Sequence, residues 1–215
     1  MIEIYIQPLA RLLGRTLSDF SQRRDFIRYQ KQQIHQYRNQ LLSQVLKQPI
    51  EHTDLSRTEF GKPFLIQHST LAFNHSHSQQ HYALAVSQQV SDVGVDIEDL
   101  SRQVRFDALA QHAFHPDEYA QWQALDYDPI YWFKVWTTKE AVLKAHGLGI
   151  RLSLNSLNTQ VHAVADGGRC EHPQLGIFAY QNYQLPHCML TVAWRSEHSY
   201  KGLAFPKIQI HQQNI

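Results

Sequence analysis

Three side chains that could share a chemical task recur at intervals of four residues in the second half of the chain. They are Trp136, Glu140 and Lys144, and the run that holds them stops at Gly147 and Gly149. Residues four apart lie above one another on an α-helix, and glutamate before lysine is the stabilising order for an ion pair. The spacing therefore predicts a helix that presents an acid and a base together and ends at glycine. A surface helix with one exposed ion pair and a core tryptophan is the simpler alternative.

A second acidic pair lies in an apolar run. Alternation places Asp96 and Glu98 on one face of a strand, with Val95 and Ile97 on the other. Two carboxylates on one face repel each other unless a proton or a cation lies between them. With Glu140 they supply three oxygen ligands of the kind that Mg²⁺ prefers, and Mg²⁺ also binds substrate phosphates. We predict a magnesium site, with Mn²⁺ as the other possible ion; a strand face with two solvated acids is the alternative.

Positive charge gathers early in the chain, at Arg23, Arg24, Arg28, Lys31 and Arg38. A basic helix opposite a metal-binding acidic cluster would suit a polyanionic ligand that is held at both ends. His75, His77 and His81 could instead bind a transition metal. Because no cysteine or further ligand follows at a suitable spacing, the sequence disfavours zinc.

Composition limits the class of protein. The chain has 215 residues, 43% hydrophobic and 18% charged, which is typical of a folded globular protein. Lys plus Arg is 20 against 19 Asp plus Glu, so net charge gives no argument for nucleic acid as a partner. Cys170 and Cys188 lack metal or redox spacing, which favours free thiols in a reducing compartment; a disulfide between them is the alternative. Without a signal-like start or an apolar run that could span a membrane, we expect a soluble cytoplasmic protein with no membrane partner.

Hydrophobic periodicity predicts the elements that must position these residues. Helices are expected at about 25–48, 106–113, 116–125 and 129–146. Strands are expected at 2–6, 82–86, 93–97, 175–180 and 187–194, with 82–86 and 93–97 as one antiparallel pair and the last two as another. Helices followed by antiparallel strands, twice over, predict an α+β fold of two similar halves, 1–100 and 101–215, each a small antiparallel sheet packed with helices. A cleft between the halves would be the natural site.

With these residues in view, the chain resembles a 4′-phosphopantetheinyl transferase of the long, single-chain, surfactin-activating type. The resemblance runs from about Arg23 to Gly149 and rests on four motifs in matching order: Gly61-Lys62-Pro63, Phe73-Asn74-His75-Ser76-His77-Ser78, Gly94-Val95-Asp96-Ile97-Glu98, and Trp136-Thr137-Thr138-Lys139-Glu140-Ala141 with Lys144. It implies transfer of the phosphopantetheine arm of coenzyme A to a serine of a carrier protein, with release of adenosine 3′,5′-bisphosphate. It also implies a pseudo-twofold α+β fold with coenzyme A between the halves.

The resemblance assigns roles to the acidic residues and to Lys144. It makes Asp96, Glu98 and Glu140 the magnesium ligands, which agrees with the interpretation from the residues alone. Glu140, or a water that it holds, is the candidate base for the carrier serine. Lys144 would bind the phosphates and stabilise the leaving bisphosphate. Asp96, Glu140 and Lys144 are thus the predicted catalytic residues.

The resemblance also assigns coenzyme A contacts. Ser76 and His77 match contact positions, with His77 near the 3′-phosphate, and Lys62 and Pro63 correspond to the adenine side. Arg38 matches a basic helix position that reaches a phosphate. The family places further cations near Arg23, Arg24 and Arg28. A plain turn at 61–63 and solvated surface arginines are the structural alternatives.

Some positions depart from the family pattern. Asn39 stands where threonine is often found, Phe26 where lysine can occur, and His75 at a usually apolar position. Some phosphate contacts are therefore expected to be weaker or relocated. The segment 102–122 is the expected contact for part of the carrier protein, through Arg105, Phe106, Phe114 and Tyr119.

Three functions remain open from the sequence. The leading hypothesis is a Mg²⁺-dependent transferase that acts as a monomer on coenzyme A and on an acyl or peptidyl carrier protein. A non-catalytic module that binds coenzyme A or the carrier is the second, and a metal-dependent phosphohydrolase is the third. The motifs do not identify the carrier, because selectivity between carriers depends on surface complementarity.

Overall fold

The computed structural model describes residues 1–196 and 205–212. Its α-helices are α1 (Leu9–Leu12), α2 (Arg23–Leu46), α3 (Phe106–Ala113), α4 (Pro116–Ala124) and α5 (Pro129–His146). Short 3₁₀ turns occur at η1 (Leu17–Asp19), η2 (His52–Asp54), η3 (Gly149–Arg151) and η4 (Leu154–Ser156). The strands are β1 (Ile2–Pro8), β2 (Leu55–Arg57), β3 (Pro63–Leu65), β4 (Ala72–His77), β5 (His81–Ser87), β6 (Val93–Asp99), β7 (Gly167–His172), β8 (Gly176–Gln184), β9 (Cys188–Ser196) and β10 (Ile208–Gln212).

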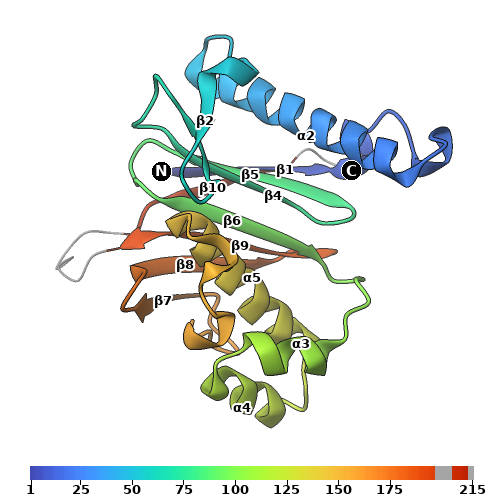
Figure 1. Cartoon of the computed structure of the whole chain (residues 1–215). Helices are drawn as coiled ribbons and strands as arrows, with labels where there is room; N and C mark the ends of the chain where they lie inside the picture. Colours follow the sequence, from blue (N-terminus) through green and yellow to red (C-terminus); the bar gives the residue numbers. More distant parts are fainter. Residues whose placement is uncertain (197–204, 213–215) are drawn as a thin grey trace.

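The elements form four layers, with α2 on one outer face and α3, α4 and α5 on the other (Figure 1). The two middle layers are sheets with strand orders β10-β1-β5-β4 and β6-β9-β8-β7. One apolar cluster joins α2 to the first sheet, a second lies between the sheets, and a third joins the second sheet to α5. The predicted α+β class is confirmed. Pseudo-twofold symmetry stays a prediction.

Helix α5 has the bounds that the sequence predicts, because its ends carry strong local signals. Asp128 accepts hydrogen bonds from the backbone N–H groups of Ile130 and Tyr131 at 3.0 and 3.1 Å, and Pro129 occupies the first turn. Gly147 has φ +89° and ends the helix in the left-handed conformation. Because these caps fix where α5 begins and ends, they help to determine which of its residues face β6.

Strand β6 lies directly against α5, and the contact requires glycine. A Cβ atom at Gly94 would collide with the backbone of Ala141 and Ala145. Side chains on the same face of β6 as Gly94, including Asp96, therefore face α5 at close range.

One predicted strand pairing is wrong. The sequence favours β5 with β6, whereas β5 pairs with β1 and β4, and β6 pairs with β9. Both edges of β5 are thus occupied, and β6 packs against the first sheet mainly through side chains. An apolar strand pattern reports burial and does not report which neighbour provides the hydrogen bonds.

Among the described strands, two pairings cross the predicted division at residue 100. Strand β6 belongs to the sheet of the second half, and β10 pairs in parallel with β1 of the first half. The division into 1–100 and 101–215 stays a prediction.

Cys170 and Cys188 are free and buried, and burial raises the pKa of each thiol to about 12. None of the described helices is long and apolar enough to cross a membrane.

Candidate functional site

The site forms where the edges of the two sheets meet the inner face of α5. Lys144 on α5 lies with its Nζ 2.5 Å from Asp96 Oδ1 on β6. The same ammonium donates to Ser76 Oγ on β4 at 2.8 Å, and Ser76 Oγ donates to Asp96 Oδ1 at 2.8 Å. Three predicted site residues from three distant segments thus share one polar cluster. Lys144 thus pairs with Asp96 on β6, whereas the spacing on α5 alone predicts Glu140 as its partner.

The charges of the three predicted metal ligands affect one another. Burial and the nearby Asp96 carboxylate raise the pKa of Glu98, although the ion pair with Arg102 at 2.6 Å lowers it in part. Burial raises the pKa of Glu140 as well; Lys144 opposes this shift and Asp96 adds to it. Burial would lower the pKa of Lys144, but Asp96 and Glu140 outweigh it and raise that pKa. Such mutual perturbation is typical of a functional site.

One oxygen of the cluster is free for a cation. Asp96 is 4% exposed, and its Oδ2 is buried without a hydrogen-bond partner. In the described residues, no group of three or more His, Cys, Asp or Glu side chains stands ready to hold a metal ion. The donor chemistry nevertheless fits Mg²⁺, because an unpaired buried carboxylate oxygen beside two further carboxylates is costly without a cation.

The predicted phosphate-binding arginines differ in their surroundings. Arg38 is 3% exposed, and its Nε and Nη2 donate to Asn39 Oδ1 at 3.1 and 2.8 Å. It lines a small cavity of about 40 Å³ together with His35, His52 and Arg57. A buried guanidinium bonded to a neutral amide retains its positive charge for an anion. The other three arginines, Arg23, Arg24 and Arg28, are exposed on α2.

The remaining predicted contacts differ in exposure and in their partners. Ser76 is buried in the polar cluster, whereas His77 beside it is exposed. Lys62 Nζ bonds with Asp92 Oδ1 at 3.3 Å and with the carbonyl of Ala145, and Pro63 begins β3. The ammonium of Lys62 therefore has partners within the protein.

The histidines considered for zinc have other neighbours. His81 Nδ1 lies 2.6 Å from Asp99 Oδ1. The ring of His75 lies 6.1 Å from that of His35 and 5.8 Å from that of Tyr82. Burial, followed by the charge of Arg38, lowers the pKa of His75 to about 3. His75, which stands at a position that is usually apolar in the family, thus places a neutral ring under α2.

The expected carrier contact is partly wrong. Phe114 is 3% exposed and belongs to the core below α5, so it cannot serve as a surface contact. Phe106 is partly buried and packs edge-on against Trp132 and Phe133, and its contact with a carrier stays a prediction. Tyr119 donates to Asp107 Oδ1 at 2.7 Å. Because the segment has no clear amphipathic spacing, its sequence does not show which of its aromatic side chains face the core.

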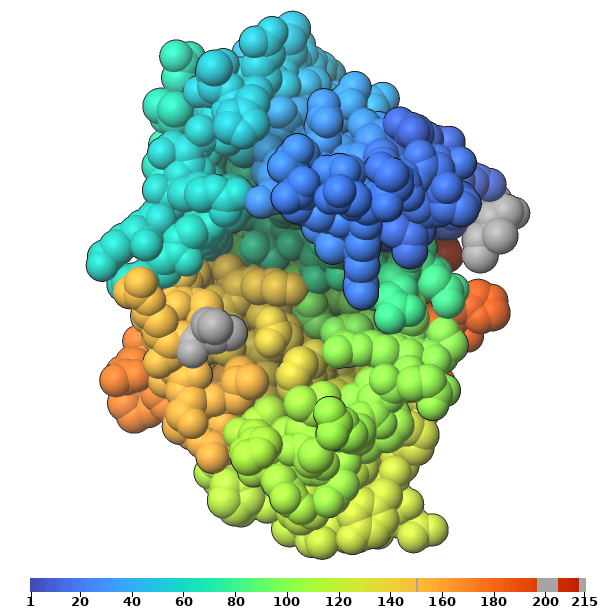
Figure 2. Space-filling view, turned by 45° about the vertical axis from the view of Figure 1, so that its right-hand side comes forward, coloured from blue at the N-terminus to red at the C-terminus, as the bar shows by residue number. Residues whose placement is uncertain are grey.

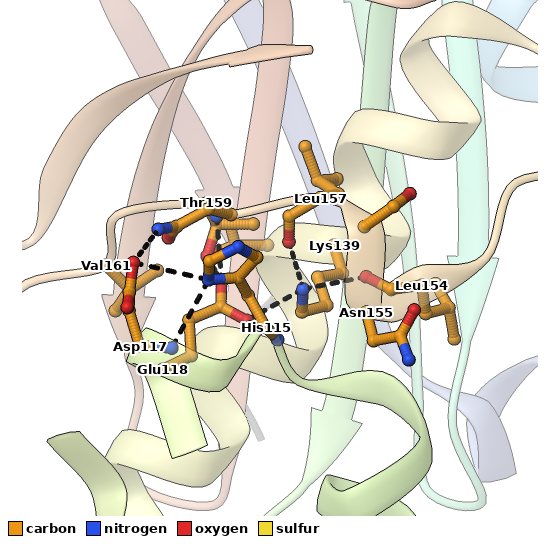
Figure 3. A network of polar contacts seen from close by, with 12 residues as sticks. His115, Asp117, Glu118, Lys139, Leu154, Asn155, Leu157, Thr159 and Val161 are labelled. Atoms are coloured by element: carbon orange, nitrogen blue, oxygen red, sulfur yellow. Dashed lines mark hydrogen bonds and ion pairs between the residues drawn. The ribbon is translucent and has the colours of Figure 1, made fainter. Parts of the chain in front are cut away.

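Lys139, within the motif of α5, is 1% exposed and lies in a polar network with Glu118 (Figure 3). Its Nζ forms a buried ion pair with Glu118 Oε2 at 2.7 Å and donates to the carbonyls of Leu154 and Leu157. Glu118 also accepts from the N–H groups of His115 and Thr159, each at 2.8 Å. This network joins α4, α5 and residues 154–159, and the sequence did not reveal it. Asn74 was also missed: its Oδ1 accepts from Val95 N at 3.1 Å and joins β4 to β6.

Figure 2 shows a hollow between the blue and cyan N-terminal residues and the green to orange residues below them. Arg28, Lys31, His35 and Asn39 border a cavity of about 570 Å³ along α2. The described lining of this cavity carries basic side chains and no Asp or Glu, which suits an anionic ligand.

Comparison with known proteins gives a consistent result. Residues 92–185 match the family model described as the 4′-phosphopantetheinyl transferase superfamily. The chain is 36% identical over 118 residues to the 4′-phosphopantetheinyl transferase gsp of Aneurinibacillus migulanus, covering 54% of this chain and 47% of that protein. It is 31% identical over 109 residues to Sfp of Bacillus subtilis strain 168 (50% and 47%) and over 122 residues to AcpT of Escherichia coli K12 (55% and 61%). The matched part spans about half the length of these relatives.

Proposed function

We propose that the chain is a 4′-phosphopantetheinyl transferase, because residues 92–185 match the family model of that superfamily. The proposed reaction moves the 4′-phosphopantetheine arm of coenzyme A to a serine of an apo acyl or peptidyl carrier protein and releases adenosine 3′,5′-bisphosphate. The observation that supports it most directly is the cluster of Asp96, Ser76 and Lys144 beside the carboxylates of Glu98 and Glu140.

In the proposed reaction the serine oxygen forms a bond to the β-phosphorus, and the bond from that phosphorus to the bridging oxygen breaks. A bound Mg²⁺, or Mn²⁺, would neutralise phosphate charge. Asp96, Glu98 and Glu140 would hold the ion. Glu140 would also take the serine proton, directly or through a water, since a raised pKa suits a group that must accept a proton. Lys144 would stabilise the charge that develops on the leaving bisphosphate.

The basic residues would hold the nucleotide. Arg38 supplies a buried charge for a phosphate. Ser76 and His77 would contact the nucleotide from β4, and Lys62 and Pro63 would lie on the adenine side. Arg23, Arg24 and Arg28 would contribute weaker, solvent-screened attraction from α2. We propose that the protein acts in the cytoplasm. We also propose that it acts as a monomer, because both walls of the hollow come from one chain.

The test is mass measurement of carrier proteins. The purified protein is incubated with coenzyme A, Mg²⁺ and a panel of apo carriers, and each carrier is weighed intact. We expect one carrier to gain the mass of a single phosphopantetheine arm, only with Mg²⁺. Glu140→Gln should lose this activity, whereas Glu59→Gln, at an exposed position, should retain it.

Other outcomes favour other functions. Coenzyme A binding without any mass gain would favour a binding module. Consumption of coenzyme A that leaves every carrier unchanged would favour a phosphohydrolase.

A further inference from the structure

A second cavity, of about 550 Å³, lies outside the polar cluster and is assigned no role by the proposed reaction. It is bordered by the end of β1, α1, the loop that follows α1, the start of α2, and the turns after β4 and β8. Its lining includes Leu9, Leu13, Leu17, Phe26, Gln80 and His81. This volume is typical of small-molecule sites.

A buried carboxylate, Asp99, lies behind one wall of this cavity and holds two of its lining residues, Gln80 and His81. Asp99 is 2% exposed and accepts hydrogen bonds from Ser78 Oγ at 2.7 Å and from Gln80 N at 2.9 Å. It also bonds with His81 Nδ1 at 2.6 Å. His81 is 8% exposed, so Asp99 fixes a nine-tenths buried imidazole in the lining. Because Asp99 is engaged with Nδ1, Nε2 is left as the ring atom for a ligand.

The rest of the lining is amphipathic. Leu9, Leu13, Leu17 and Phe26 supply apolar surface, and Thr16, Gln79 and Gln80 supply hydroxyl and amide groups. No Asp or Glu is among the described lining residues. The guanidinium of Arg15 lies 4.2 Å over the ring of Phe20 and donates to the carbonyl of Asp19, so its charge is partly engaged. Such a lining suits a neutral chain of amide and hydrocarbon groups more than a nucleotide with phosphates.

The cavity lies at the far end of the strand that carries the acidic pair. Asp99 ends β6 and follows Asp96 by three residues, which is roughly 10 Å along a strand. At the other end of β6, Asp92 contacts Lys62 near the proposed adenine side. The polar cluster at Asp96 therefore lies between a nucleotide side and this cavity.

We propose that this cavity binds the pantetheine arm of coenzyme A while the phosphates lie at Asp96. This inference rests on the proposed function. The arm carries two amides, a hydroxyl and a gem-dimethyl group, which match the amides and the leucines of the lining. It starts at the phosphate next to the metal ligands, so it can extend along the end of β6 toward His81 and Gln80.

Calorimetry with two ligands tests the proposal. Coenzyme A carries the arm, whereas adenosine 3′,5′-bisphosphate lacks it. Leu17→Trp fills the mouth of the cavity from a position that is 49% exposed, and Val164→Trp, at an 82% exposed position elsewhere, is the matched control. We expect Leu17→Trp to weaken coenzyme A about tenfold and to change adenosine 3′,5′-bisphosphate less than twofold. Gln80→Ala, which removes a side-chain amide and keeps the backbone bond to Asp99, should act in the same direction.

The other outcomes are distinct. If Leu17→Trp and Gln80→Ala leave coenzyme A binding unchanged, or weaken both ligands equally, the cavity does not hold the arm. If neither ligand binds the unmodified protein in the presence of Mg²⁺, the proposed function fails, and this inference fails with it.

Discussion

Asp96 uses its two carboxylate oxygens differently. Oδ1 bonds with Lys144 and Ser76, while Oδ2 is buried and has no partner. The ion pair compensates part of the cost of burying the carboxylate, and the open oxygen leaves a place for a cation. Removing Lys144 and removing the cation should therefore have separate effects on binding and on catalysis.

Lys144→Met should lower the rate of carrier modification by about 10²- to 10³-fold, because a charge aimed at the leaving phosphate is typically worth that much. Lys144→Arg should recover part of the loss. The measurement is kcat/KM from the mass gain of the carrier, with circular dichroism as a check on folding. Lys207→Met, at an exposed position, is the control. A normal rate in Lys144→Met would remove this residue from the proposed mechanism.

His75 makes folding sensitive to acid. Its pKa is lowered to about 3 in the fold by burial and by Arg38, whereas an unfolded chain has a value near 6.5. Between these values the unfolded chain binds a proton that the folded chain does not, so stability falls as pH falls. His35, with a pKa lowered to about 4, adds to the effect.

We expect the free energy of unfolding to fall by about 3 kcal/mol between pH 7 and pH 4 because of His75. His75→Leu should flatten this dependence, as measured by urea unfolding at several pH values. His112→Gln, at an exposed position of α3, should keep the original slope. Equal slopes in all three proteins would mean that His75 is not the responsible group.

Spacing predicted most of the site at this scale. Glu140 and Lys144 follow from helical periodicity, and Asp96 and Glu98 follow from alternation in a strand. The bond between Lys144 and Asp96 could not be predicted, because it depends on how closely β6 approaches α5. That approach depends in turn on Gly94, because a side chain there would collide with α5. Hydrophobic periodicity does not indicate such a contact.

At the scale of elements, α5 presents two different faces. Glu140 and Lys144 point toward the acidic strand, while Lys139 points into the C-terminal core and pairs with Glu118 of α4. The buried pair fixes how α4 and residues 154–159 lie on α5 (Figure 3). Its loss would leave an uncompensated charge within the core.

Lys139→Met and Glu118→Gln should each lower the free energy of unfolding by about 3–5 kcal/mol, because each leaves one buried charge alone. The double variant Glu118→Gln/Lys139→Met should lose clearly less than the sum, since both charges are gone and glutamine still accepts from Thr159 N. Urea unfolding of the four proteins gives the coupling energy. Strictly additive losses would contradict a direct interaction.

For the whole molecule, the sequence predicted the elements better than their connections. Apolar alternation and helical spacing located β5, β6, β9 and α5, since these patterns follow from burial alone. The pairing of β6 with β9 and of β10 with β1 joins residues far apart in the chain, and no local pattern encodes it. The first sheet also contains a parallel pair, which the expectation of two purely antiparallel sheets did not include.

Contacts across the molecule make Lys62 a link between its N-terminal and C-terminal parts. Its ammonium bonds with Asp92 before β6 and with the carbonyl of Ala145 near the end of α5, and its stem lies against Gly147. Asp92 is held in addition by Arg195 at 2.5 Å. Burial lowers the pKa of Lys62, and the charge of Asp92 opposes this shift.

Lys62→Met should therefore destabilise the protein in the absence of any ligand, by about 1–2 kcal/mol for the lost charge-assisted hydrogen bonds. For a chain of this size the expected fall in Tm is several degrees. Thermal unfolding without coenzyme A measures this effect, with Lys207→Met as the control. Coenzyme A titration of the same variant measures ligand contact separately. If Tm is unchanged and only coenzyme A binding weakens, Lys62 serves the ligand and does not join the two parts of the molecule.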